Sequence, residues 1–335
     1  MSKRAVRLRE AEILRDRLRD FGAEEGGGYG YGYGYGYGYG YGGGGDFNLS
    51  RTRAVTGTPV YAIGRVEWRY PSSGVKMEVA QEIQRLDNPL ANTVVLRKAE
   101  PRLLAVSNRL ADGHFYLMRQ LCWVLTINAV ETYILQPRDS AGFEMIADAV
   151  QNSVASPNQY LDVVVGVRGP MAPPQMCRGL RLPIVMFDQI ISFNREQNID
   201  LLVFLGQGRV PPLVGVTRAH IEEALNRTTQ VARNTGASDR HRALNYLAVN
   251  NYPEFYLNAA DECHGTPPGL PQRDAFLSGV EVRRSRQSGA RRIVDVIFAF
   301  TDNNTSVVRK FFVRVDVTER FPFLVTPWSP YYDHS

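Results

Sequence analysis

Residues 291–317 read RRIVDVIFAFTDNNTSVVRKFFVRVDV, and this stretch decides the fold class. Two runs rich in valine, isoleucine and phenylalanine flank the turn sequence DNNTS, which is typical of paired antiparallel strands. The run before them, FLSGVEVRRSR at 276–286, is joined to them by the turn sequence SGA. We therefore expect a three-stranded antiparallel meander at the C-terminal end.

Upstream of the meander, strands and helices alternate without a regular β–α–β rhythm. Strands are expected at VYAIGRVEWRY, RQLCWVLT, ETYILQP, LDVVVGVRG and PIVMFDQIISF, with the second and third forming a hairpin across 127–130. Helices are expected at 73–86, 101–110 and 218–233, and at DRHRALNYLAV, which Ser238 or Asp239 caps. The sequence thus predicts an α+β fold with mixed and antiparallel sheets and packed helices.

The first 58 residues differ sharply in composition from the rest. Residues 1–21 are charged throughout and carry one apolar stripe, so they predict a helix. Between Gly26 and Gly45, seven tyrosines stand at every second position from 29 to 41, and glycine makes this tract disordered by itself. When the tract is extended, its phenols share one face, which suits a groove or a sheet edge. The tyrosines are candidate modification sites: Tyr29, Tyr31, Tyr33, Tyr35, Tyr37, Tyr39 and Tyr41.

The composition sets broad limits on the class of protein. No run approaches the ~18 apolar residues of a membrane-spanning helix, and the charged N-terminus is unlike a secretory signal. We therefore expect a cytoplasmic protein that does not enter a membrane. The three cysteines are far apart and odd in number, which argues against a disulfide framework. A net charge of +5 gives only weak support for a nucleic-acid partner.

Five long stretches resemble one known family. They are VYAIGRVEWRYPS, RQLCWVLTINAVETYILQPRD, DVVVGVRGPMAPPQMCRGL, DRHRALNYLAVNNYPEFY and RRIVDVIFAFTDNNTSVVRKFFVRVDVTERFPFLVTPWSPYYD. They are similar to the C-terminal domain of the cyanobactin maturation proteases of the PatG type, which also occurs on PatA-type partners. The resemblance implies a domain without an assigned activity that accompanies enzymes which cut and macrocyclise ribosomal peptides. Nothing here matches the subtilisin-like Asp/His/Ser domain, so the peptidase and macrocyclase activities are not carried over.

The resemblance suggests three segments and one function. Residues 1–21 resemble a leader, residues 22–58 form a core-like tract with a linker, and residues 59–335 form the globular domain. We expect an accessory, peptide-binding domain whose partners are a peptide, in cis or in trans, and peptide-modifying enzymes. An enzyme that modifies its own tyrosines and a scaffold that self-associates through the tract remain alternatives. The oligomeric state stays open.

Other candidate sites are weighed against structural roles. If a zinc or copper ion is bound, Cys122, Cys177 and His241 are the preferred ligands because they lie in the family-like stretches, although no cofactor is evident. Cys122 also fits a core position. Arg168, between Gly166 and Gly169 at a strand end, could face an anion, but a rigid turn is the competing interpretation.

An arginine-rich hairpin is the last candidate. Facing strands would gather its charges, and their repulsion would favour an acidic peptide or a nucleic acid, unless the face is simply solvated. No catalytic dyad is visible, and Asp295 and Asp316 are interpreted as partners in structural salt bridges. The arginines are Arg283, Arg284, Arg286, Arg291 and Arg292.

Overall fold

The computed structural model of the chain describes residues 57–86, 115–155, 159–209, 213–232, 234–249 and 252–333. Residues 57–335 form one compact unit. The expected helices at 1–21 and 101–110 and the whole Tyr–Gly tract lie outside the described residues. No helix in the described ranges is long and apolar enough to cross a membrane.

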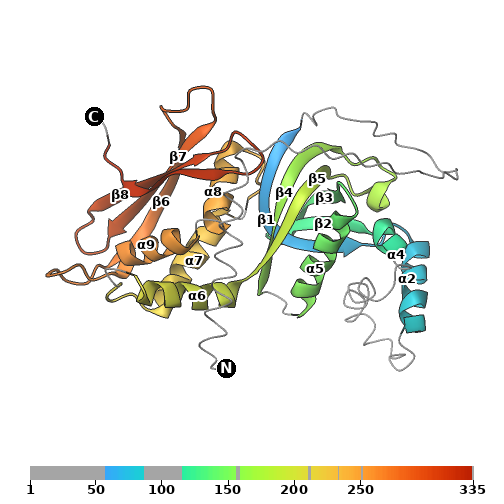
Figure 1. The fold of residues 1–335 in the computed structure, drawn as a ribbon, viewed down its shortest axis with the longest axis horizontal. Coiled ribbons are helices and arrows are strands. Elements are labelled where there is room, and N and C mark those ends of the chain that lie inside the picture. The colour runs from blue at the N-terminus through green and yellow to red at the C-terminus, as the bar shows by residue number, and fades with distance from the viewer. Residues whose placement is uncertain are drawn as a thin grey trace, which may run out of the picture. The chain divides into compact units, whose positions relative to one another are not determined.

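Five strands close into a barrel in the order β1–β2–β3–β5–β4 (Figure 1). All neighbours are antiparallel except β3 and β5, which run parallel. The helix α5 (Ala141–Ala155) connects β3 to β4. A five-stranded barrel with this connectivity is an OB-type fold. The strands are β1 (Thr58–Arg69), β2 (Cys122–Ile127), β3 (Val130–Pro137), β4 (Tyr160–Met171) and β5 (Pro183–Asn194).

The barrel interior is built from alternate strand residues. Ala62, Leu125, Val164 and Phe187 point into one apolar cluster. Side chains of α5 and of two further helices, α2 (Ser73–Leu86) and α4 (Phe115–Gln120), belong to the same apolar cluster. The expected hairpin is confirmed, and its two turn residues, at positions 128 and 129, have positive φ, as a tight two-residue turn requires.

The C-terminal sheet contains the expected meander and one additional strand. Its order is β6–β7–β8–β9, antiparallel throughout. The fourth strand carries Pro327, which lacks a backbone donor and is tolerated because β9 is an edge strand. The strands are β6 (Ala275–Arg284), β7 (Ile293–Asp302), β8 (Val308–Asp316) and β9 (Phe323–Pro330).

In the described part of the chain, four helices separate β5 from β6, and aromatic rings fill the contact between the last of them and the C-terminal sheet. Phe255, on the last helix, meets Phe298 with ring centroids 4.7 Å apart and Trp328 at 5.7 Å. Trp328 also stacks on Phe311 at 5.2 Å, which ties the edge strand into the core. The helices are α6 (Arg195–Gln207), α7 (Arg218–Ala232), α8 (Asp239–Val249) and α9 (Tyr252–His264).

Helix α8 joins the barrel to the C-terminal sheet. Its Asn245 side chain donates to the Tyr61 carbonyl of β1 over 2.7 Å. The buried Arg242 donates to the carbonyl of Val317, just after β8, over 2.7 Å. The expected cap is confirmed, since the Ser238 hydroxyl accepts from a first-turn N–H over 3.2 Å. This one helix therefore holds both sheets.

Candidate functional site

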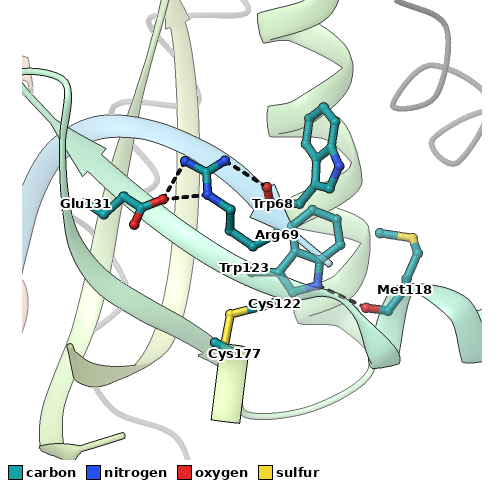
Figure 2. Close-up of a disulfide and its surroundings, with 7 residues drawn as sticks. All are labelled: Trp68, Arg69, Met118, Cys122, Trp123, Glu131 and Cys177. Atoms are coloured by element: carbon teal, nitrogen blue, oxygen red, sulfur yellow. Dashed lines mark hydrogen bonds and ion pairs between the residues drawn. A yellow bond between two sulfur atoms is a disulfide. The ribbon is translucent and has the colours of Figure 1, made fainter. Parts of the chain in front are cut away.

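The outer face of β1, β2 and β3 carries a set of linked polar side chains. The Arg69 Nε donates to the Glu131 Oε1 over 2.6 Å, and the Thr126 hydroxyl donates to the Glu67 Oε2 over 2.7 Å (Figure 2 shows the first contact). Half of the Arg69 side chain and 39% of the Glu67 side chain remain exposed. We call these four residues, Glu67, Arg69, Thr126 and Glu131, the polar row. They offer both donors and acceptors to a ligand.

Next to the polar row, a disulfide joins Cys122 at the start of β2 to Cys177 (Figure 2). The expectation of no disulfide is therefore wrong. The two residues are 55 positions apart, yet the fold brings their Cα atoms to 5.6 Å, a normal spacing for a disulfide. The number of cysteines is odd because Cys263 is a third, free cysteine. Burial raises the pKa of its thiol to about 11.

Cys177 lies in the connection between β4 and β5, residues 172–182, which we call the cover loop. The loop packs on Cys122, Val124 and Ile134, which point outward from β2 and β3 and which we call the covered patch. Its apolar side chains Met176, Leu180 and Leu182 complete this small cluster. The cover loop thus hides the apolar part of the face whose polar part stays open.

Of the three expected metal ligands, the structure joins two in a disulfide and places the third on helix α8. The sulfurs of Cys122 and Cys177 are bonded to each other, and a disulfide sulfur is not the thiolate that binds zinc. His241 lies in the first turn of α8, where its Nδ1 is 3.1 Å from the Thr235 hydroxyl. Burial and the nearby Arg240 lower the pKa of His241. Among the described side chains, no group of three His, Cys, Asp or Glu residues could hold a metal ion.

The expected anion site also has a different setting. Gly166 and Arg168 lie within β4 rather than at its free end, and their backbones pair with both β1 and β5. A Cβ at residue 166 would come within 2.4 Å of the Met186 carbonyl, so glycine serves the close packing of the strands there. The Arg168 side chain itself is exposed.

Most of the hairpin arginines are neutralised within the chain. Arg283 donates to Glu281 over 2.6 Å, and Arg292 lies 3.1 Å from Asp239. Arg291 forms an ion pair with Asp316, and Asp295 pairs with Arg314 over 2.8 Å, which confirms the structural role expected for both aspartates. Within the described ranges, Arg284 and Arg286 have no carboxylate at ion-pair distance. The hairpin is therefore less basic than its sequence indicates.

One buried carboxylate escaped the sequence analysis. Asp162 is fully buried in β4, where it accepts hydrogen bonds from the Val66 N–H over 2.8 Å and the Ser192 hydroxyl over 2.5 Å. Burial raises the pKa of Asp162 to about 6. A single acidic residue at the start of an apolar run, DVVVGV at 162–167, is the signal that could have revealed it.

Two family descriptions match successive parts of the chain. Residues 59–201 match the family described as PatG Domain, and residues 214–331 match the one described as PatG C-terminal. This chain carries a PatG-type C-terminal region. The first match covers the barrel with most of α6, and the second covers the α7–α9 helices with the C-terminal sheet. PatG-type regions imply involvement in cyanobactin-type biosynthesis.

A solved structure described as "PatG Domain of Unknown Function" has the same PatG-type fold. It aligns with a TM-score of 0.60 at 18% sequence identity, over 82% of this chain and 99% of the solved one. At that identity the likeness concerns the fold. No curated protein matches the chain.

Proposed function

We propose that the PatG-type region of this chain is an accessory, peptide-binding domain of ribosomal peptide biosynthesis, and that it binds through the outer face of β1–β3. The observation that carries the proposal is the polar row beside the covered patch. Exposed, fixed donors and acceptors beside an apolar area suit an extended peptide with amide and phenol groups. Other enzymes would modify the bound peptide.

The fold analogy supports the same face. OB-type barrels bind extended oligomers across their second and third strands and the adjoining loops, including the loop between strands four and five. Those elements correspond here to β2, β3 and the cover loop. This is an argument from analogy, because one fold serves many functions.

Charge on the strands of this face favours a peptide over a nucleic acid. The polar row holds two carboxylates and one guanidinium, Arg65 of β1 balances the count on the strands, and the exposed Arg178 and Arg181 of the cover loop add two positive charges beside them. A polyanion needs a clear excess of positive charge to bind. The Tyr–Gly tract at 26–45 contains no charged residue, so it meets no repulsion there. Its presence on the same chain raises its effective concentration to the order of millimolar.

The test uses the full-length chain with the seven tract tyrosines replaced by serine, so that no phenols compete in cis. A fluorescent synthetic peptide of residues 26–45 is titrated with this protein, with and without a dithiol, and anisotropy reports binding. We expect saturable binding, and Glu131→Gln should weaken it by roughly fivefold through loss of about 1 kcal/mol of hydrogen bonding.

A matched control lies on the other sheet. Glu281 pairs with an arginine on the outer side of β6, as Glu131 does on β3, although the Glu281 side chain is 56% exposed and that of Glu131 is 26% exposed. Glu281→Gln should leave the affinity unchanged. Absence of saturable binding in both redox conditions would refute the proposed function, and equal effects of the two variants would refute the assignment of the surface.

A further inference from the structure

We propose that the cover loop is a redox-controlled lid over the peptide-binding face, and that reduction of the Cys122–Cys177 disulfide opens it. This inference rests on the proposed function and adds its regulation. The lid would lift from the covered patch and let aromatic side chains of the Tyr–Gly tract pack there.

The first support is the position of the disulfide. It is the covalent bond between the cover loop and the strand below, joining Cys177 near the middle of the loop to the first residue of β2. The base of the loop is closed separately, by a hydrogen bond of 2.8 Å from the Ala172 N–H to the Leu182 carbonyl. Reduction would therefore release the tip of the loop while its two ends stay anchored.

The second support is the backbone of the loop. Cys177, Arg178 and Gly179 follow one another with φ values of 51°, 56° and 83°. Side chains disfavour this left-handed region, so two of these three residues are held in costly conformations. The disulfide fixes one of the two strained residues. Once the disulfide is broken, the segment lowers its free energy by leaving this conformation.

The bond is buried, but its surroundings make it reachable. Cys177 is 8% exposed and Cys122 is 4% exposed, yet the loop residues on either side, Gln175 and Arg178, are exposed. Modest movement of the loop would bring the Cys177 sulfur to the surface. In a reducing compartment such disulfides are mostly transient or redox-sensing, whereas in an oxidising one they persist.

The reductant is a dithiol, either a small molecule or a protein. Its thiolate attacks the Cys177 Sγ and forms a mixed disulfide, and the Cys122 sulfur leaves as a thiolate that takes up a proton. The second thiol of the reductant then displaces the Cys177 sulfur, which is protonated in turn. The protein disulfide gains two electrons and two protons, and the dithiol is oxidised to a disulfide.

The occupant we assign is the chain's own Tyr–Gly tract. The described chain begins at Gly57, and the next residue, Thr58, pairs with Arg168, only four positions before the cover loop starts. The tract ends 12 residues before Gly57, a distance of at most about 40 Å along the chain. Tethered phenol rings are therefore within reach of the covered patch, which is lined by apolar groups and sulfur.

The experiment uses the same full-length tyrosine-to-serine protein and the labelled peptide of residues 26–45. Affinity is measured for the oxidised form and after reduction with dithiothreitol, and hydrogen exchange of residues 172–182 is followed in both. We expect faster exchange in the loop and at least a tenfold gain in affinity on reduction, equal to about 1.4 kcal/mol. The double variant Cys122→Ala/Cys177→Ala should behave like the reduced form, and Cys263→Ser should respond to reduction like its parent.

The possible outcomes distinguish failure of the lid proposal from failure of the proposed peptide-binding function. If the hydrogen exchange of residues 172–182 does not change on reduction, the lid proposal is wrong, whatever the affinity for the peptide. A mobile loop with equal affinity in both forms also overturns it but leaves the proposed function standing. Absence of binding in both forms refutes the function together with the lid. Should the double variant fail to fold, the reduced parent protein supplies the same comparison.

Discussion

The barrel and the C-terminal sheet each bury one aspartate, and the pKa values of the two move in opposite directions. Burial raises the pKa of Asp162 in the barrel to about 6, because its hydrogen-bond donors are neutral groups. Burial also acts to raise the pKa of Asp316 in the sheet, but hydrogen bonds from Thr318 and Arg291 outweigh it, and the pKa is lowered. The buried acid of the barrel thus accepts from a backbone N–H and a hydroxyl, whereas the buried acid of the sheet also accepts from an arginine.

The outer faces of the barrel and of the C-terminal sheet also differ in what covers their side chains. On the C-terminal sheet, arginines lie over neighbouring rings and beside neighbouring carboxylates, as Arg314 does with Phe312 at 5.0 Å and with Asp295. The covered patch of the barrel is instead hidden by a chain segment held through one covalent bond. The polar groups on the outer face of the C-terminal sheet already pair with one another, so little of that face is left to bind a ligand. The covered patch can become accessible when the cover loop moves.

The largest effect is expected where the two regions meet, at Arg242. Its guanidinium is 1% exposed and donates to the carbonyls of Val317, Glu319 and Arg320. Arg242→Met leaves these carbonyls without their donor and should lower the free energy of unfolding by about 3–5 kcal/mol. Urea denaturation measures the loss. The exposed neighbour substitution Arg240→Met should stay within about 0.5 kcal/mol, and an equally small loss for Arg242→Met would contradict the joining role of α8.

Reducing the disulfide should have the next largest effect on stability, and it should be confined to the barrel. A crosslink between residues 55 positions apart contributes about 2–4 kcal/mol in the chain-entropy account. Denaturation of the full chain with and without dithiothreitol measures this difference. The Cys122→Ala/Cys177→Ala protein should show no response to the reagent. Hydrogen exchange that rises equally in β7 and in β2 would contradict the assignment of the effect to the barrel.

The pH dependence of the two buried aspartates gives a third comparison. Asp162 has a higher pKa in the folded protein than the ordinary 3.8, so its contribution to stability is complete below about pH 4 and is lost as the pH rises through about 6. Asp162→Asn keeps the shape and removes this loss. Its stability relative to wild type should therefore increase by up to about 3 kcal/mol between pH 4 and pH 8.

Asp316 serves as the matched variant with the opposite sign. Its lowered pKa stabilises the fold above its ordinary pKa, and this contribution is lost as the pH falls. Asp316→Asn should therefore be destabilised most near neutral pH and least in acid. Thermal or urea midpoints across the pH range test both proteins, and parallel profiles would contradict the pKa assignments.

Sequence patterns predicted the elements whose signal lies within a few neighbouring residues. The β2–β3 hairpin, the meander and α8 were predicted because alternation, turn residues and a capping serine act over a few positions. The edge strand β9 was missed because Pro327 resembles a strand breaker. Helix α9 was missed because Pro253 occupies its first turn, where proline is tolerated although it is read as an interruption.

The candidate site was less predictable because its contacts are not local. The sulfurs of Cys122 and Cys177 meet only after the barrel closes, so an odd cysteine count suggested free thiols. The polar row likewise joins β1 to β3, 62 positions apart in the case of Arg69 and Glu131. The hairpin arginines looked like an anion site because two of their carboxylate partners, Asp316 on β8 and Asp239 on α8, are distant in the sequence.

The smallest effect is expected for Arg283, one of the sequence-derived candidates for peptide binding. Its side chain is exposed, donates to Glu281 on the same strand, and lies 6.0 Å from the Tyr331 ring. Exposed ion pairs of this kind are weak because water and salt screen them. Arg283→Gln should therefore shift neither the urea midpoint nor the affinity for the 26–45 peptide beyond experimental error. Arg69→Gln, the corresponding change in the polar row, should also leave the midpoint nearly unchanged but weaken peptide binding. If Arg283→Gln weakens binding more than Arg69→Gln does, the peptide contacts the C-terminal sheet, and the roles assigned to the two faces must be exchanged.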